Sequence, residues 1–313
     1  MTDIVTVTIN PAIDVSTTVD HVEPTRKLRC KNVRRDPGGG GINAARLVRR
    51  LGREVTAIYP EGGSIGRLLT RLVEGQGIAS LAIEVAQETR EDFTAFDESI
   101  GDQYRFVLPG PRLSTNEWHR CLDALDSLPT RPRYVIASGS LPPGVPDDFY
   151  AQLTRRAAAL GAKLVLDTSG PALAAALRAG GVYLVKPNLG ELRGLVQAPL
   201  DDRTARVNAC RDIVAAGGAE VVALTLGREG ALLVTANGAW HAPAMAVKVA
   251  SAVGAGDSFL GAMVWSLCEG HPVQQAFRCG VAAGSAALLM PGTELGQADD
   301  IRRMLPDVET VPI

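Results

Sequence analysis

The stretch Ser251-Ala252-Val253-Gly254-Ala255-Gly256-Asp257-Ser258 directly precedes an apolar, helix-like segment at residues 259–268. A helix that begins there points unpaired backbone N–H groups, and the positive end of its dipole, into one small space. Such a space suits a phosphoryl group, and the glycines let the backbone approach it closely. Asp257 could take a proton from an attacking hydroxyl group. The stretch therefore indicates phosphoryl transfer to an alcohol, although a tight turn with Asp257 as helix cap would use the same residues.

Short runs rich in β-branched residues alternate with helix-like segments along most of the chain. Ala44, Leu47, Val48 and Leu51 recur at the spacing of one apolar helical face. This alternation indicates βαβ units and a mainly parallel, covered sheet, whose ligands gather beyond the carboxyl ends of the strands. Strands are expected at residues 4–9, 55–59, 134–137, 164–166, 182–185 and 221–226.

Two segments, residues 14–33 and 89–108, break this alternation. They contain strand-like runs at 15–19 and 103–107 with no helix between their strands. We therefore expect a small antiparallel sheet that projects from the main sheet. It could be a lid that excludes water, or a surface for a second copy of the chain. After Thr293 the sequence predicts a last helix and a loose, proline-containing terminus.

The composition narrows the class of protein. A net charge of −2 gives no support for a nucleic-acid surface. The five cysteines are scattered without a CxxC pair, which favours free thiols in a reducing compartment, and the four histidines lack zinc-ligand spacing. The start of the chain lacks a signal-peptide pattern, and no window approaches the roughly 18 apolar residues of a membrane span. These features predict a cytoplasmic protein without nucleic-acid or membrane partners.

A second glycine run, Pro37-Gly38-Gly39-Gly40-Gly41-Ile42-Asn43, also leads into a helix. Four consecutive glycines are costly in conformational entropy, so close approach of the backbone to a ligand explains them better than a mere loop. Asn43 could both cap the helix and hold a hydroxyl group. Neither glycine run has the spacing of a P-loop or of a dinucleotide-binding fingerprint. The sequence therefore argues against a P-loop ATPase and a dehydrogenase.

Polar residues follow other predicted strands. Asp14 comes after the first strand and could accept bonds from two sugar hydroxyls, or could simply be part of a turn beside Pro11. Asn188 and Glu191, three residues apart after the strand at 182–185, could organise a hydrated magnesium ion. A capping box would use the same two residues.

Several further residues are candidates for binding anions. Residues 225–230 could bring backbone to a nucleotide or make a hairpin turn. Arg105 lies inside an apolar strand, where a guanidinium group needs an anion. Together with Lys27, Arg29 and Arg90, it could hold a phosphate already present on a substrate, although solvated surface charge is the simpler interpretation of each one.

Taken together, five motifs resemble the PfkB (ribokinase-like) carbohydrate kinase family over nearly the whole chain. They are Asn10-Pro11-Ala12-Ile13-Asp14, the glycine run that ends in Asn43, Ser138-Gly139-Ser140-Leu141-Pro142-Pro143-Gly144, Lys186-Pro187-Asn188 with Glu191, and Gly254-Ala255-Gly256-Asp257. Segments 27–30, 101–107 and 281–287 are most similar to the bacterial 6-phosphofructokinase branch of the family. Gly40 stands where the 1-phosphofructokinase and tagatose-6-phosphate kinase relatives usually have lysine.

The resemblance implies a role for each matching residue. Asp257 would be the catalytic base, with Gly254, Ala255 and Gly256 as the anion hole. The phosphosugar would lie among Asp14, Gly39, Asn43, Arg90, Arg105 and Ser140. ATP would meet Lys186, Asn188, Thr225, Gly227, Gly230 and Ser285, with Lys27 reaching it across a dimer, and Asn188 and Glu191 near Mg²⁺.

The resemblance also implies a potassium site made mostly of backbone oxygens. It would use Ser251, Val253, Ala287, Met290, Gly292 and Glu294. This chain has Ser251-Ala252 where many members of the family have Asp-Thr, and that difference bears on the potassium site more than on the base.

The resemblance implies a single three-layer α/β/α domain over residues 1–313, with lid strands from about 12–35 and 88–108 that pair two copies into a homodimer. The expected reaction is ATP-dependent phosphorylation of fructose 6-phosphate to fructose 1,6-bisphosphate. The alternatives are 1-phosphofructokinase or tagatose-6-phosphate kinase activity, a kinase of an unphosphorylated sugar or nucleoside, and a non-catalytic sugar-phosphate or nucleotide sensor.

Overall fold

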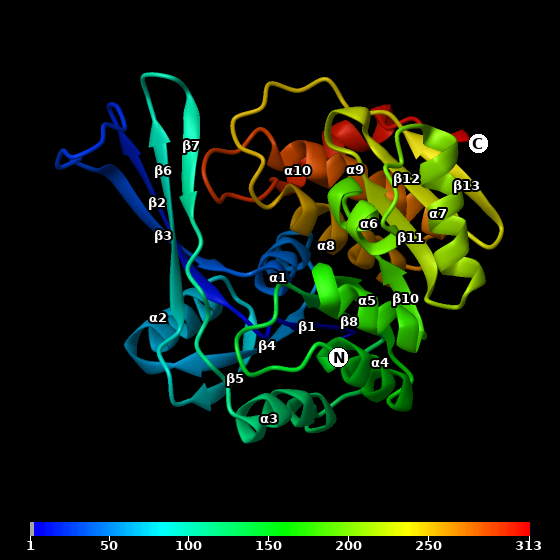
Figure 1. Ribbon diagram of the computed structural model, residues 1–313, viewed down its shortest axis with the longest axis horizontal. Coiled ribbons are helices and arrows are strands. Elements are labelled where there is room, and N and C mark those ends of the chain that lie inside the picture. The colour runs from blue at the N-terminus through cyan, green and yellow to red at the C-terminus, as the bar shows by residue number, and fades with distance from the viewer. Residues whose placement is uncertain (1–2) are drawn as a thin grey trace.

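The computed structural model describes residues 3–313, and its main feature is a ten-stranded sheet in the order β14-β13-β12-β11-β10-β9-β8-β1-β4-β5 (Figure 1). Seven neighbouring strands of this sheet, β11, β10, β9, β8, β1, β4 and β5, are parallel to one another. At the β11 edge, β12, β13 and β14 are added, and each runs antiparallel to the strand before it. The strands are β1 (Ile4–Val7), β4 (Val55–Gly62), β5 (Ala79–Val85), β8 (Tyr134–Ser138), β9 (Lys163–Asp167), β10 (Val182–Val185), β11 (Ala219–Thr225), β12 (Ala231–Thr235), β13 (Gly238–Ala242) and β14 (Val311–Pro312).

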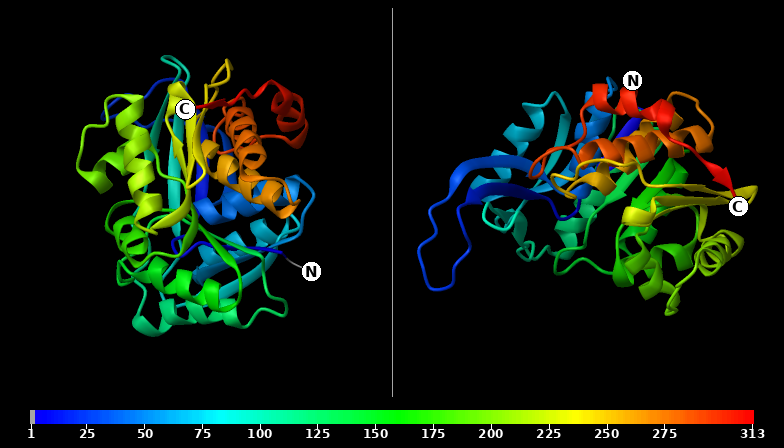
Figure 2. Two further views of the ribbon diagram at one scale, coloured as in Figure 1. Left: turned by 90° about the vertical axis from the view of Figure 1, so that its right-hand side faces the viewer. Right: turned by 90° about the horizontal axis from the view of Figure 1, so that it is seen from above.

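Helices cover both faces of this sheet (Figure 2). Successive strand residues such as Val135 and Ile136 point to opposite faces and join two separate hydrophobic clusters. One cluster packs under α1 (Gly40–Arg50), α2 (Gly63–Glu74), α8 (Ala255–Cys268), α9 (Val273–Ala287) and α10 (Ala298–Met304). The other packs under α3 (Thr115–Asp126), α4 (Phe149–Ala159), α5 (Gly170–Ala179), α6 (Leu189–Val196) and α7 (Arg203–Ala215). The predicted three-layer α/β/α fold is confirmed.

A second sheet of four strands projects from the main one, in the order β3-β2-β6-β7 (Figure 1). The expectation of a purely antiparallel sheet is wrong, because β2 and β6 run parallel. Both strands leave the carboxyl ends of parallel central strands, β1 and β5, so they start in the same direction. The four strands are β2 (Ala12–Val19), β3 (Lys31–Gly38), β6 (Arg90–Asp97) and β7 (Asp102–Phe106). We call this sheet the lid sheet.

The expectation of a loose C-terminal end is wrong. After α10 and a short 3₁₀ turn (Leu305–Asp307), β14 pairs with β13, with Val311 opposite His241. Pro312 lacks an N–H group, which is tolerated at the edge of a sheet. None of the helices within residues 3–313 combines the length and hydrophobicity that crossing a membrane requires.

Candidate active site

The glycine-containing stretch at the start of α8 forms a helix entrance. Gly254 is the N-cap residue and has a φ of 75°, a left-handed conformation that favours glycine. Asp257 is the third residue of the helix, and no side chain of residues 3–313 caps this helix end, so the interpretation of Asp257 as a cap is wrong. Its Oδ2 instead accepts a hydrogen bond of 2.9 Å from Nδ2 of Asn43 on α1.

The carboxyl group of Asp257 has the electrostatics of a base that works near neutral pH. Burial, reinforced by the nearby charge of Asp167, raises its pKa from 3.8 to about 6. The hydrogen bond from Asn43 and the positive charge of Lys186 act in the opposite direction. The group is therefore ionised at pH 7 but basic enough to take a proton from a hydroxyl group.

The second glycine run wraps around two acids. A Cβ atom on Gly40 would lie 2.1 Å from Oγ of Ser138 and 3.0 Å from Oδ1 of Asp257, and one on Gly38 would lie 2.5 Å from the Asp14 carboxyl group. These positions therefore need glycine for close approach. The expectation that Asn43 caps the helix is wrong, because Gly39 is the N-cap of α1 and Asn43 lies one turn further along.

An ion pair between buried Lys186 and partly buried Asp167 lies beside the entrance of α8. Nζ of Lys186 is 3.1 Å from Oδ1 of Asp167, and a Cβ on Gly256 would lie 3.2 Å from the same Nζ. Burial alone would lower the pKa of Lys186, but the carboxyl groups of Asp167, Asp257 and Glu191 act in the opposite direction and together raise it. Lys186 thus keeps a positive charge beside the helix entrance.

Asp167 was missed by the sequence analysis. It is the last residue of β9, directly after the run 164–166 that was recognised as a strand. An acid at the carboxyl end of a parallel strand was the available signal, because such ends line the ligand edge of the sheet.

Asn188 and Glu191 form the capping box that was the simpler alternative. Oδ1 of Asn188 accepts from the Glu191 N–H at 2.9 Å, and Oε2 of Glu191 accepts from the Asn188 N–H at 2.8 Å. Burial raises the pKa of Glu191, and the charge of Asp167 adds to this rise. Asp167 also raises the pKa of Asp257, so its charge acts on both carboxyl groups. Within residues 3–313, no three or more Asp, Glu, His or Cys side chains form a cluster that could hold a metal ion by themselves. Magnesium usually keeps several waters and takes only one or two carboxylates beside substrate phosphates, so the side chains of Asn188 and Glu191 would fit a hydrated ion, which would supply charge neutralisation for the phosphates.

Residues 225–230 make the hairpin turn between β11 and β12, which was one of the two expected outcomes. Gly230 has a φ of 93°, and a Cβ there would lie 2.0 Å from the Ala242 carbonyl oxygen. Buried Arg206 holds the turn through a 2.7 Å ion pair with Glu229. Thr225 pairs in parallel with Asn188, so this turn lies beside the start of α6. Ser285 is buried on α9.

The lid sheet brings the predicted phosphosugar residues onto one face. Asp14 on β2 lies opposite Asp92 on β6, and Arg90 precedes Asp92 by two residues on the same strand. Thr94 follows Asp92 by two residues and lies opposite Arg105 on β7. Side chains two residues apart on a strand share a face. Arg90, Asp14 and Arg105 therefore line the same side of this sheet.

The environments of these lid residues differ. Burial, followed by the charge of Asp92, raises the pKa of Asp14 to about 7, and Arg105 opposes the rise. Arg90 donates to the backbone oxygens of Leu108 (2.9 Å) and Asn10 (3.2 Å). Arg105 lies within β7, between Tyr104 and Phe106, as expected, and its side chain is exposed.

Ser140 and Lys27, the remaining predicted binding residues of this part of the molecule, are both exposed. Exposed Ser140 accepts a 3.2 Å hydrogen bond from Nδ2 of Asn10. Lys27 is exposed in the loop between β2 and β3.

The predicted potassium residues come from two loops held together by hydrogen bonds. Oγ of Ser251 donates to the Gly292 carbonyl oxygen at 2.8 Å and accepts from the Val253 N–H at 3.2 Å. Glu294 forms an ion pair with Arg34 of the lid sheet. Ala287 and Met290 lie at and just after the end of α9. The loops carry backbone oxygens that suit a monovalent cation, while the Glu294 carboxylate is already engaged.

A model of the pfkB family of carbohydrate kinases matches residues 1–300. The chain belongs to this family. It is 42% identical over 300 residues to ATP-dependent 6-phosphofructokinase isozyme 2 of Mycobacterium tuberculosis, and the aligned region covers 96% of this chain and 88% of that relative. It is 40% identical over 304 residues to the enzyme of the same name from Escherichia coli K12, covering 97% and 98% of the two chains.

Solved structures agree with these relatives. Phosphofructokinase-2 from Escherichia coli in complex with potassium matches with a TM-score of 0.93 and 38% identity, covering 98% of this chain and 99% of that one. The same protein in complex with fructose-6-phosphate matches with a TM-score of 0.92 and 37% identity, again covering 98% of this chain and 99% of that one. It has also been solved as a tetrameric inhibited form. The protein is thus a sugar-phosphate kinase of the PfkB family, as its sequence motifs indicated.

Proposed function

We propose that this protein is an ATP-dependent 6-phosphofructokinase that converts fructose 6-phosphate to fructose 1,6-bisphosphate. One observation carries the proposal: the partly buried Asp257 at the entrance of α8 accepts a hydrogen bond from Asn43, lies against the glycine run at Gly40, and feels the positive charge of Lys186. The lid sheet adds Asp14, which acts electrostatically on Asp257. The substrate named for the Escherichia coli structure supports the choice of sugar.

In the proposed reaction, Asp257 accepts the proton of the 1-hydroxyl group of the sugar. That oxygen forms a bond to the γ-phosphorus of ATP while the bond between this phosphorus and the β–γ bridging oxygen breaks, and ADP leaves. Backbone N–H groups of residues 254–256, the dipole of α8 and the ammonium group of Lys186 stabilise the charge on the transferred group. Magnesium held near Glu191 would neutralise phosphate charge.

The nucleotide would occupy the side of the sheet where the β10–α6 and β11–β12 connections meet. Lys186, Asn188, Thr225, Gly227 and Gly230 come from these connections and Ser285 from α9. The glycines allow close backbone approach to the ligand. We further propose that residues 1–313 act as one kinase domain, with the lid sheet closing over the sugar to exclude water.

The 6-phosphate of the sugar would meet Arg90 and Arg105, with Ser140, Gly39 and Asn43 nearer the reacting end. Replacing Arg105 with alanine should reduce kcat/KM for fructose 6-phosphate by about 10- to 150-fold, because one charge-assisted hydrogen bond is lost. The KM for ATP should stay near the native value. Steady-state kinetics with each substrate varied in turn measures both. Equal use of fructose and fructose 6-phosphate by the native protein would contradict this assignment.

An assay of ADP release with a panel of acceptors tests the whole proposal. Fructose 6-phosphate should give the highest kcat/KM, above fructose 1-phosphate, tagatose 6-phosphate, fructose, ribose and adenosine. Preference for fructose 1-phosphate or tagatose 6-phosphate would instead place the protein in another branch of the family. Ligand binding without turnover of any acceptor would favour a sensor.

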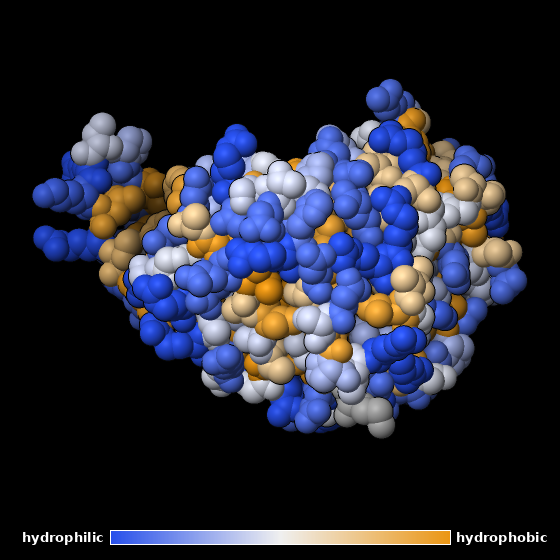
Figure 3. Space-filling model, turned by 90° about the horizontal axis from the view of Figure 1, so that it is seen from below, coloured by the Kyte–Doolittle hydropathy of each residue, from blue (hydrophilic) through white to orange (hydrophobic). Residues whose placement is uncertain are grey.

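We also propose that two copies associate through the lid sheet. Tyr104 and Phe106 lie on the opposite face of β7 from Arg105 and are exposed, as are Leu28, Val33 and Ile100. Figure 3 shows hydrophobic atoms on this projecting part of the molecule. Burying them against a second copy would shield apolar surface and the sheet edge. Lys27 could then reach the partner's nucleotide. Sedimentation at micromolar concentration should give a dimer or a larger assembly, and a monomer would contradict this.

A potassium site near the start of α8 is a further part of the proposed function. The loops of Ser251 and Gly292 are joined by a hydrogen bond, and the Escherichia coli relative was solved in complex with potassium. We propose that potassium binds these loops and steadies the entrance of α8, because this helix begins at Ala255, directly after the loop that contains Ser251 and Val253.

A further inference from the structure

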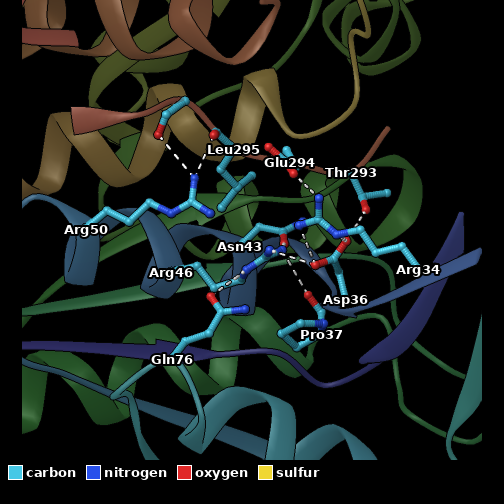
Figure 4. A network of polar contacts seen from close by, with 11 residues as sticks. Arg34, Asp36, Pro37, Asn43, Arg46, Arg50, Gln76, Thr293, Glu294 and Leu295 are labelled. Carbon is cyan, nitrogen blue, oxygen red and sulfur yellow. Dashed lines mark hydrogen bonds and ion pairs between the residues drawn. The ribbon is translucent and has the colours of Figure 1, made fainter. Parts of the chain in front are cut away.

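Arg46 is the largest fully buried side chain within residues 3–313 and has no role in the reaction described above. It lies on α1, one turn beyond Asn43, with 1% of its surface exposed. Its guanidinium group donates to Oδ1 of Asn43 at 3.0 Å, to the Pro37 carbonyl oxygen at 3.1 Å and to Oε1 of Gln76 at 3.0 Å. Figure 4 shows these groups converging on Arg46 from different elements.

The contact with Asn43 settles which way its amide group points. Arginine carries only hydrogen-bond donors, so the atom of Asn43 that faces Arg46 must be the oxygen. The NH₂ group of Asn43 then faces Asp257, to which it donates at 2.9 Å. An amide turned by 180° would present two donors to each other at Arg46.

The other side of Arg46 is tied to the lid sheet and to the loop after α9. Asp36 on β3 accepts from Arg46 at 3.4 Å and from Thr293 at 2.9 Å, and it pairs with Arg34 at 2.8 Å. Arg34 also pairs with Glu294. A continuous chain of polar contacts therefore runs from this loop through β3 and Arg46 to Asn43 (Figure 4), and Asn43 in turn donates to Asp257.

We propose that Arg46 is a positioning residue for phosphoryl transfer, which locks the amide of Asn43 so that its NH₂ group faces Asp257. This inference rests on the proposed role of Asp257 as the base. A donor aimed at Asp257 favours the carboxylate over the protonated acid, because a hydrogen bond to the negatively charged form is the stronger one. The anchoring of Arg46 by Asp36 and Gln76 keeps its fork in one orientation.

Loss of Arg46 should therefore move the acid limb of the kcat profile. The Asn43 bond and the charge of Arg46 both lower the pKa of Asp257, against the upward effects of burial and Asp167. Lys186 and, from the lid sheet, Asp14 are the other charged groups that act on it, and neither is changed. In Arg46→Met the acid limb should shift up by about one pH unit, so kcat should fall by about 10-fold at pH 5 and by about 2-fold at pH 7.

The variants Arg46→Met, Arg46→Lys and Arg49→Met would be measured with saturating ATP and fructose 6-phosphate across pH 5–9, with thermal unfolding as the check of folding. Arg49 is exposed on the same helix, and its variant should keep the native profile. Arg46→Lys keeps a charge without the fork, so its acid limb should move in the same direction by less. It serves as the test if Arg46→Met does not fold. A native acid limb in a folded Arg46 variant would overturn the proposal.

A double-mutant cycle with Asn43→Ala tests whether Arg46 acts through Asn43. In the Asn43→Ala background, Arg46→Met should lower kcat at pH 5 by less than about 2-fold, because there is no amide left to orient and only the smaller direct effect of the Arg46 charge remains. A further loss as large as in the native background would show that Arg46 acts by another route and would overturn the proposal. If Asp257→Asn keeps the native acid limb, the base assignment itself fails, and the role of Arg46 falls with it. A native limb in the Arg46 variants alone refutes only the positioning role.

Discussion

Replacing Asp257 with asparagine is expected to lower kcat by about 10²–10⁴-fold, which is the usual contribution of a general base. Asparagine keeps the size of the side chain, and its oxygen can still accept the bond from Asn43. It cannot take up the proton of the attacking hydroxyl group. Binding of fructose 6-phosphate and ATP, measured by calorimetry, should stay near the native level.

The pH dependence of the native protein follows from the same residue. Because burial raises the pKa of Asp257 to about 6, the base is ionised above that pH and becomes protonated as the pH falls through it. The kcat should therefore decline below about pH 6, and Asp257→Asn should lack this acid limb.

Ser258→Ala provides a matched control for this variant. Ser258 is the next residue of α8, is fully buried, and its Oγ has no hydrogen-bond partner within residues 3–313. The kcat of Ser258→Ala should stay within about 2-fold of the native value, because the substitution removes no hydrogen bond. Near-native turnover of Asp257→Asn would show that Asp257 is not the base.

Replacing Lys186 with methionine is expected to lower kcat by about 10²–10³-fold, the scale seen when one electrostatic contact to a transition state is removed. The ammonium group lies beside Gly256 and is held there by Asp167, so it faces the place where charge develops on the transferred phosphoryl group. Its loss also removes a charge that lowers the pKa of Asp257, so the acid limb should move upward.

The kinetic pattern distinguishes the role of Lys186 in the reaction from a role in binding alone. A lower kcat with little change in the KM for ATP indicates a contact made mainly in the transition state. A higher KM with native kcat would contradict that role. Lys163→Met is the control, because Lys163 is an exposed lysine at the opposite end of β9 from Asp167. It should keep native kinetics. Thermal unfolding checks whether Lys186→Met tolerates the unpaired Asp167.

Local chemistry was sufficient to predict the parts of the site that depend on neighbouring residues. The αL conformation of Gly254 and the close contacts of Gly38 and Gly40 occur within glycine runs that are readable in the sequence. The alternation of strands and helices predicted the parallel sheet, because the two periods are written into consecutive residues. The strand at Val182–Val185 was predicted with its observed bounds.

Contacts between distant residues could not be predicted in this way. The carboxyl group of Asp167 joins Lys186 only because β9 and β10 are neighbours in the sheet. The parallel pairing of β2 with β6, and the addition of β14 to the sheet edge, likewise depend on where separate segments meet. Residues 14 and 105 share a face only through the registers of three strands.

The sequence by itself determined that an acid follows a glycine-rich helix entrance in a parallel α/β protein, because helix ends, glycine conformations and strand periodicity are local properties. Only the tertiary structure decided that Asn43, 214 residues away, donates to that acid, and that Arg46 holds the amide in place. The orientation of an amide and the pKa of a buried carboxyl group depend on which charges and donors packing brings within a few ångströms. Such neighbours are set by the whole fold.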